Sequence, residues 1–202
     1  KFVSNLRPDL VVSLIPIGID VQSFAATQGV ALDRSSIDLP LNKTIIGSFQ
    51  KDGVGFGESL EPKLEKGPDL LVEFLRNVSS QIDIHVLLTG PSRGYVKFWL
   101  DKYGIEYTHV TYQDSEELRD VFKLIDFYVC TSREEGGPKG VFEAAAARVP
   151  VFSTSVGQVE DTLKDGVSFY EFEYFCPMKM SEKFVKNIGN DHSNLVKNAY
   201  QA

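Results

Sequence analysis

Apolar residues fall into two kinds of segment that alternate along the chain. Short runs rich in β-branched residues are typical of buried strands, and longer segments with apolar residues every three or four positions are typical of helices. Strands are predicted at 44–49, 82–90, 108–112, 126–130, 149–154 and 167–172. Helices are predicted at 68–78, 95–103, 114–125, 141–149, 178–188 and 194–200. This strand–helix–strand repetition predicts an α/β fold, a doubly wound, Rossmann-like parallel sheet with crossover helices.

Local signals support these boundaries and indicate where a ligand would bind. Gly67 and Pro68 are a typical helix start, and Asp114 with Glu117 three residues later resembles a capping box. The segment 82–90 is almost continuously apolar, as expected for a strand buried on both faces. In doubly wound sheets, ligands bind beyond the carboxyl ends of the strands. The loops that follow the predicted strands there are 48–67, 90–94, 111–115, 131–140 and 155–158.

Composition narrows the class of protein. The 202 residues carry 21 Lys and Arg against 28 Asp and Glu, a formal net charge of −7, and 43% are hydrophobic. This composition is typical of a globular domain, and its acidic balance argues against a protein that coats nucleic acid or an anionic membrane. With only Cys130 and Cys176 present, we expect no disulfide framework and a reducing, cytoplasmic setting. Contact with the inner face of a membrane stays open, although no apolar run reaches the ~20 residues that span a bilayer.

Several familiar site motifs are absent from the sequence. The loop Gly53-Val-Gly55-Phe-Gly57 lacks the third glycine of a dinucleotide-binding fingerprint, because Glu58 occupies that position. We interpret it as a flexible glycine-rich loop. No GxxxxGK[ST] phosphate-binding motif occurs. No Asp-x-Asp pair occurs either, and the histidines and cysteines lack metal-ligand spacing, so we predict no metal site.

Residues 131–140 (TSREEGGPKG) form the strongest candidate site. The segment follows a predicted strand, contains three glycines and a proline, and leads into a helix that carries Glu143. The free N–H groups of that helix's first turn favour an anion such as a diphosphate. Glu135 and Glu143 can each accept paired hydrogen bonds, which suits the hydroxyls of a ribose or hexose. Taken alone, the loop is explained equally well by two glutamates that favour the helix dipole.

Lys66 adds a cation at the same edge of the predicted sheet. It precedes Gly67 and Pro68 at the start of the helix after the first strand, where it could neutralise a diphosphate as a point charge. By itself, a solvated lysine beside Glu65 is the simpler interpretation. The coincidence of Lys66 with Glu135 and the helix starts favours a ligand site.

With these residues in view, the sequence resembles the C-terminal, donor-binding domain of the GT-B retaining glycosyltransferases of family 4 (glycosyl transferases group 1). The resemblance covers most of residues 11–170 and is sharpest in the Glu-x7-Glu spacing of Glu135 and Glu143, followed by an Ala-rich helix, Pro150 and a Val-Gly turn. The matching stretches are 15–24 (IPIGIDVQSF), 64–75, 87–92, 114–161 and 164–166.

The resemblance implies roles for individual residues. Glu135 would contact the donor hexose near the reacting carbon, Glu143 would bind the ribose hydroxyls, and Lys66 would hold the diphosphate leaving group. Backbone amides of the glycine loop would approach the sugar and phosphates, and neighbouring loops would hold the base. The remaining residues that we assign to the nucleotide-sugar site are Lys51, Gly90, Tyr112, Gly136, Gly137, Pro138 and Lys139.

The sequence departs from the family pattern at two places. The family usually has an arginine, the second diphosphate cation, soon after the glycine of the first strand. Here Lys51 is the nearest cation after Gly47, and a glycine-rich insertion at 52–65 separates it from Lys66. Arg148 stands where a glycine is common, a change that we expect to matter only for packing.

The resemblance implies transfer of a hexose from a nucleoside-diphosphate sugar to an acceptor hydroxyl with retention, without a metal or other cofactor. The acceptor would be a glycan, lipid or small molecule. We predict the end of an N-terminal acceptor domain or its linker at 1–15, the donor-binding domain at 16–175 and C-terminal helices at 176–202. Because the chain begins with Lys rather than Met, we interpret it as the donor half of an enzyme, inactive without its N-terminal domain. A nucleotide-sugar epimerase of the same architecture and a non-catalytic nucleotide-sugar-binding module remain alternatives.

Overall fold

Six parallel strands form the centre of the computed structural model, which describes residues 5, 9–11, 13, 15–25, 32–55, 57–112, 115–172 and 176–202. Their order is β3-β2-β1-β4-β5-β6, the doubly wound order in which the chain builds from the middle to one edge and then to the other. The predicted fold class is confirmed. The strands are β1 (Thr44–Ser48), β2 (Ile84–Thr89), β3 (Tyr107–Val110), β4 (Phe127–Cys130), β5 (Val151–Thr154) and β6 (Tyr170–Phe172).

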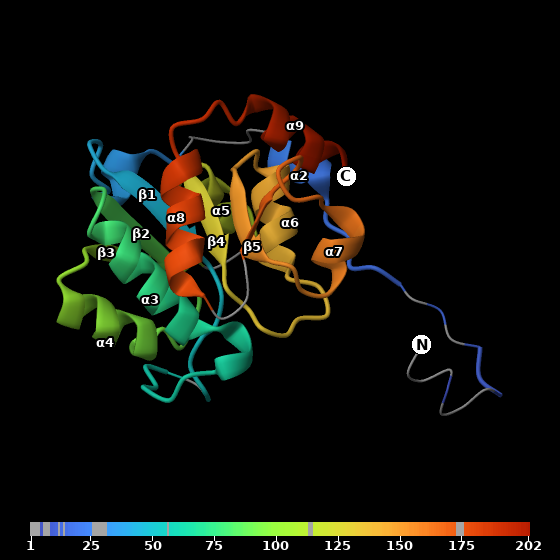
Figure 1. Ribbon diagram of the computed structural model, residues 1–202, viewed down its shortest axis with the longest axis horizontal. Helices are drawn as coiled ribbons and strands as arrows, with labels where there is room; N and C mark the ends of the chain where they lie inside the picture. Colours follow the sequence, from blue (N-terminus) through green and yellow to red (C-terminus); the bar gives the residue numbers. More distant parts are fainter. Residues whose placement is uncertain are drawn as a thin grey trace.

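Helices cover both faces of this sheet (Figure 1). The helices are α2 (Val21–Ala25), α3 (Pro68–Ser79), α4 (Gly94–Tyr103), α5 (Ser115–Phe122), α6 (Lys139–Ala146), α7 (Gln158–Thr162), α8 (Pro177–Asn187) and α9 (Ser193–Gln201), with 3-10 turns η1 (Arg34–Ile37) and η2 (Leu64–Lys66). Helices α3, α4 and α8 pack on one face, and α2, α5, α6, α7 and α9 pack on the other. The described helices therefore leave neither face of the sheet exposed.

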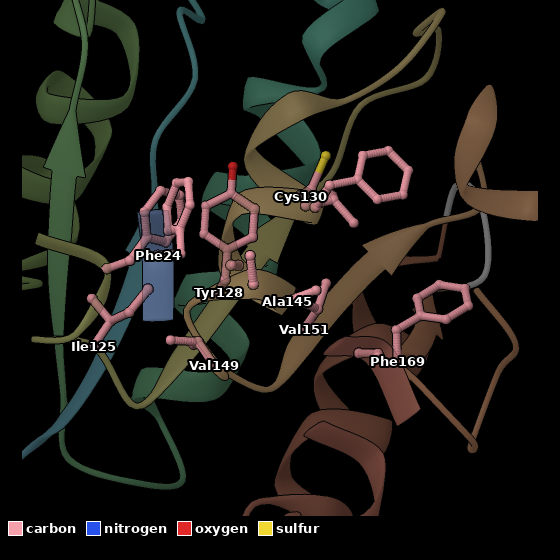
Figure 2. Packing of buried hydrophobic residues seen from close by; sticks show 14 of the residues in the cluster. Phe24, Ile125, Tyr128, Cys130, Ala145, Val149, Val151 and Phe169 are labelled. Carbon is pink, nitrogen blue, oxygen red and sulfur yellow. The ribbon is translucent and has the colours of Figure 1, made fainter. Parts of the chain in front are cut away.

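Successive residues of β4 show how one strand serves both cores. Phe127 and Val129 belong to the cluster under α3 and α8, whereas Tyr128 and Cys130 belong to the cluster under α6. Figure 2 shows the second cluster, in which Val151 lies beside Tyr128. Burial on both faces explains why the strands are almost continuously apolar.

Two predicted boundaries shift for local reasons. The helix predicted at 141–149 ends at Ala146 because the chain reverses at Arg148, whose φ of 61° lies in the left-handed region. That conformation is one that glycine adopts without strain, and the Arg148 guanidinium lies 4.8 Å from the ring of Tyr200. The strand predicted at 167–172 begins only at Tyr170, because the Ser168 N–H donates to the carbonyl oxygen of Lys164 in a turn.

The short helices α2 and α7 and both 3-10 turns were not predicted. Each has five residues or fewer, too short for a periodic pattern to emerge. The capping box predicted at Asp114 lies outside the described residues, and α5 is described from Ser115 onward.

Candidate functional site

The candidate site lies where the strand order reverses, at the carboxyl ends of the neighbouring strands β1 and β4. The loops 49–67 and 131–138 leave these two strands. Backbone hydrogen bonds join the loops, since the N–H groups of Arg133 and Glu134 donate to the carbonyl oxygen of Glu65 at 2.8 and 3.1 Å. The two loops therefore form one connected unit.

Gly67 allows the loops to approach this closely. Its φ is 62°, and a Cβ at this position would overlap the carbonyl oxygen of Thr131. The Thr131 hydroxyl in turn donates to the carbonyl oxygen of Gly67 at 2.8 Å. The Gly67-Pro68 pattern therefore marks a contact between two loops as well as a helix start.

A bidentate ion pair fixes the same contact through side chains. Arg133 donates to both carboxylate oxygens of Asp69 at 2.7 Å and to the carbonyl oxygen of Leu64 at 2.9 Å. Partial burial by itself would raise the pKa of Asp69, but the hydrogen bonds and charge of Arg133 outweigh it and lower that pKa. Such bidentate pairs are strong and directional. Because Leu64 and Asp69 lie on either side of Lys66, they hold this lysine against the loop after β4.

Lys66 and Glu135 meet at the centre of this unit. The Nζ atom of Lys66 lies 2.5 Å from Oε1 of Glu135, and the two side chains are only 23% and 14% exposed. The Ser132 hydroxyl lies 3.0 Å from the same carboxylate oxygen and 3.2 Å from Oε1 of Gln50. The Gln50 amide nitrogen donates to the backbone carbonyl of Lys66 at 2.8 Å. The cation and the carboxylate that the sequence singled out are therefore in direct contact and held by neighbouring polar groups.

Glu143 forms a second pair of this kind. It lies in α6 and is almost fully buried, and its Oε1 lies 2.9 Å from Nζ of Lys139, one turn earlier in the helix. Tyr112, in the loop after β3, is near enough that, after burial, the charge of Glu143 raises the pKa of its phenol. Burial first, and then nearby charges that include Glu143, likewise raise the pKa of Tyr128. The structure thus places Tyr112, Lys139 and Glu143 in one neighbourhood.

Two helix N-termini open at this edge of the sheet. Helix α3 begins after Gly67, and α6 begins after Pro138. Neither Gly67 nor Pro138, the residue before each helix, caps its start with a side chain. In the first turn of α3, however, the Asp69 carboxylate interacts with the backbone N–H groups of Asp69 and Leu70, which helps to lower its pKa. The first turn of α6 contains no acidic side chain, since Glu143 lies further along the helix, so the N–H groups of this turn are the ones open to a ligand. Free N–H groups at a helix start, together with the helix dipole, attract anions.

Gly136 and Gly137 lie between Glu135 and the start of α6. The carbonyl oxygen of Gly136 accepts a hydrogen bond from the N–H of Gln158 at 3.1 Å. The Gln158 side chain accepts from the N–H of Ile17 at 2.9 Å and donates to its carbonyl oxygen at 3.2 Å. The glycine loop is therefore tied, through Gln158, to the segment that precedes α2.

Gly90 lies in the loop after β2, and Lys51 lies in the same loop as Lys66, after β1. Gly90 directly follows β2, and its carbonyl oxygen lies 2.8 Å from Nε2 of His109. A Cβ on Gly90 would lie 3.9 Å from the backbone of Gln50, so this glycine is close to the Lys66 network. Lys51 follows Gln50 and is half-buried.

The sequence reading missed a buried ion pair beside this network. Nε of Arg93 lies 2.7 Å from Oδ2 of Asp52, and both side chains are fully buried. Burial raises the pKa of Asp52 to about 6, although the charge of Arg93 opposes the shift. The only signal in the sequence was a charged residue within the loop 90–94 that follows β2. Gln50, Ser132 and Arg133 were also missed, because such common polar residues form no motif.

Other features of the described residues do not add to this site. They contain no cluster of three or more potential metal ligands and no helix long and apolar enough to cross a membrane. Cys130 and Cys176 are free thiols. Nε2 of His85 lies 2.8 Å from the Thr108 hydroxyl, and Nδ1 is buried 3.7 Å from the Glu106 carboxylate, so this histidine belongs to the strands and not to the site. A cavity of about 720 Å³, whose lining includes Thr44, lies at the opposite edge of the sheet. This cavity is therefore separate from the polar side chains of the candidate site.

Comparison with known proteins gives a family match. The sequence model of the family described as Glycosyl transferases group 1 matches residues 57–201, which is more than half of the chain. These residues include the Lys66–Glu135 and Lys139–Glu143 pairs. A comparison with curated proteins finds no significant match.

Solved structures share the fold at low sequence identity. The C-terminal domain of a glycosyl transferase group 1 family protein from Francisella tularensis has a TM-score of 0.70 and 17% identity, with 91% of this chain and 95% of that chain covered. Sucrose-phosphate synthase from Thermosynechococcus elongatus has a TM-score of 0.71 and 21% identity, with 94% and 47% covered. HepE from Anabaena, solved with UDP and glucose, has a TM-score of 0.71 and 15% identity, with 91% and 50% covered. The chain thus spans about half the length of the last two proteins.

Proposed function

The chain belongs to the glycosyl transferases group 1 family, and from this premise we propose that it binds a nucleoside-diphosphate sugar for transfer of its hexose. The acceptor is a hydroxyl group, and the anomeric configuration is retained. The observation that carries the proposal is the contact between Lys66 and Glu135, 2.5 Å apart at the point where the strand order reverses. Doubly wound sheets bind nucleotides at this point.

The diphosphate is expected to lie between the starts of α3 and α6. Lys66 supplies a full positive charge there, both helix N-termini supply partial positive charge, and the start of α6 supplies free N–H groups. When the bond between the anomeric carbon and the diphosphate oxygen breaks, negative charge grows on the leaving group. Fixed positive groups aimed at that oxygen stabilise the transition state more than the ground state.

We assign Glu135 to the hexose and Glu143 to the ribose. Glu135 accepts hydrogen bonds from sugar hydroxyls and orients the anomeric carbon toward the acceptor oxygen, which attacks from the face that the diphosphate leaves. The acceptor proton passes to the departing phosphate oxygen, so the charges balance. Tyr112, Gly90 and Lys51 border the nucleotide, and Lys139 helps to hold Glu143.

Charge neutralisation of the diphosphate is assigned to Lys66 and the helix starts rather than to a divalent cation. The sequence contains no Asp-x-Asp pair, and the candidate carboxylates, Glu135 and Glu143, each pair with a lysine. A second α/β domain would supply the acceptor side. Sucrose-phosphate synthase and HepE, the similar chains of which this one spans about half, support that division. We therefore expect the chain alone to bind nucleotide without transferring sugar.

The test is a titration of the chain with UDP, GDP and ADP by calorimetry. We expect one of the three to bind, and Lys66→Met to weaken that binding at least tenfold, because the diphosphate loses its lysine. Lys63→Met is the matched control. Lys63 lies three residues away in the same loop and pairs with Glu65 at 3.5 Å.

Two results contradict the proposal. One is that none of the three diphosphates binds to the folded chain. The other is that Lys66→Met and Lys63→Met weaken binding equally, which would reduce the role of Lys66 to general surface charge. If one diphosphate binds as expected, addition of an N-terminal domain should allow transfer from the nucleotide sugar that carries the same base. The anomeric signal of the product in an NMR spectrum then shows whether the configuration is retained.

A further inference from the structure

The buried Arg93 holds the ends of two strands together at the candidate site. Its guanidinium donates to the carbonyl oxygens of Ser48, at the end of β1, and Thr89, at the end of β2, at 2.5 and 2.8 Å. Its Nε donates to Oδ2 of Asp52 at 2.7 Å. One side chain therefore connects β1, β2 and the start of the glycine-rich loop.

The residues that Arg93 holds lie on either side of Gln50. Ser48 precedes Gln50 by two residues, and Asp52 follows it by two. Gln50 is the side chain that donates to the backbone carbonyl of Lys66 and lies 3.2 Å from the Ser132 hydroxyl. A displacement of residues 48 or 52 therefore moves the group that supports Lys66.

Asp52 also fixes the far end of the glycine-rich loop. Its carbonyl oxygen accepts a hydrogen bond from the N–H of Lys63 at 2.8 Å, and the N–H of Val54 donates to the carbonyl oxygen of Glu61 at 3.0 Å. These two hydrogen bonds join the two ends of the loop, and Lys63, at its second end, lies three residues before Lys66. Arg93 is therefore connected to Lys66 by two routes, one through the Gln50 side chain and one through the backbone of Asp52 and Lys63.

Stability alone is a weak explanation for this ion pair. Replacement of a buried ion pair by apolar residues of similar size is often neutral or stabilising, because burial of two charges costs nearly as much as their attraction returns. The second oxygen of Asp52, Oδ1, is buried without a hydrogen-bond partner among the described residues, so the pair is incompletely satisfied. An apolar side chain could not hold the four acceptors of the guanidinium in a fixed geometry. These are the carbonyl oxygens of Ser48 and Thr89, the Ser48 hydroxyl and Oδ2 of Asp52.

We infer that Arg93 is a positioning residue, which places Lys66 for contact with the diphosphate through Asp52, Ser48 and Gln50. This inference rests on the proposed function. It means that Arg93, which is buried and does not contact the ligand, controls the affinity for the second phosphate.

The experiment compares the affinities of the chain for a nucleoside diphosphate and for the monophosphate of the same base. UDP and UMP, GDP and GMP, and ADP and AMP are titrated, and the pair that binds wild type best is used. One variant is Gln50→Ala, which removes the link without burying a charge. The other is the double variant Asp52→Leu with Arg93→Met, which replaces the ion pair by apolar side chains.

We expect both variants to lower the ratio of diphosphate to monophosphate affinity at least fivefold. The monophosphate affinity should stay within twofold of wild type, and the midpoint of thermal unfolding of Gln50→Ala within a few degrees. Arg76→Met, an exposed arginine on α3 paired with Glu73, is the control and should leave the ratio unchanged. A purely structural role for Arg93 would instead lower both affinities together.

Two outcomes overturn the inference, and they are distinguishable. If wild type binds a diphosphate but the ratio is unchanged in Gln50→Ala and in the folded double variant, Arg93 does not position Lys66. If the double variant does not fold, Gln50→Ala decides the question alone. If wild type binds none of the three diphosphates, the proposed function fails and the inference fails with it.

Discussion

Removal of the negative charge on Glu135 should strengthen the binding of a nucleoside diphosphate that lacks the sugar. In the structure, Nζ of Lys66 lies 2.5 Å from Oε1 of Glu135. A diphosphate that recruits Lys66 must replace this contact or share the lysine with it. In the variant Glu135→Gln the amide competes less strongly for the lysine, so Lys66 is more available to the phosphates.

The size of the effect follows from how far the pair is buried. An exposed ion pair contributes up to about 1 kcal/mol, whereas loss of one partner of a buried pair costs about 3–5 kcal/mol. The two side chains are 23% and 14% exposed, so the pair lies between these limits but still contacts solvent. We therefore expect Glu135→Gln to make the binding free energy of the diphosphate more favourable by about 1–2 kcal/mol, which corresponds to roughly 5- to 30-fold tighter binding.

The assay is isothermal titration of the chain with the diphosphate that binds wild type best. Glu134→Gln is the matched control, because Glu134 precedes Glu135 in the same loop and is exposed. This control measures the general gain from removing one negative charge near an anion site. Equal gains for both variants, or weaker binding for Glu135→Gln, would contradict the proposed competition for Lys66.

Three further predictions concern ribose, metal and pH. Glu143→Gln should weaken diphosphate and monophosphate alike, about tenfold, because ribose is common to both and a charged acceptor is lost; an unequal loss in titrations of the two would contradict the assignment. EDTA should change diphosphate affinity less than threefold, and a tenfold loss would reveal a metal site. Burial raises the pKa of Asp52 to about 6 from its ordinary value of 3.8, so the folded state binds this proton more tightly than the unfolded state. The free energy of unfolding of wild type, relative to Asp52→Asn, should therefore fall as pH rises from about 4 to 6, by roughly 3 kcal/mol at most, and urea denaturation at both pH values measures it.

The order of elements and the edge that carries the site were predictable because both depend on local patterns. Apolar runs such as 126–130 indicate strands that are buried on both faces, and the helical period after Pro68 indicates a crossover helix. Parallel strands bring every following loop to one edge. Lys66 and Glu135 could therefore be assigned to the same edge before their distance was known.

The contacts within the site could not be predicted, because each depends on how distant segments are placed against one another. Lys66 and Glu135 are 69 residues apart, and the fold brings them together by placing β4 beside β1 and by the approach of Gly67 to Thr131. The sequence determined that a cation and a carboxylate would share one edge of a parallel sheet. Only the tertiary structure decided that they touch, and that a buried Arg93 supports them, because side-chain contacts depend on packing geometry that no local periodicity encodes.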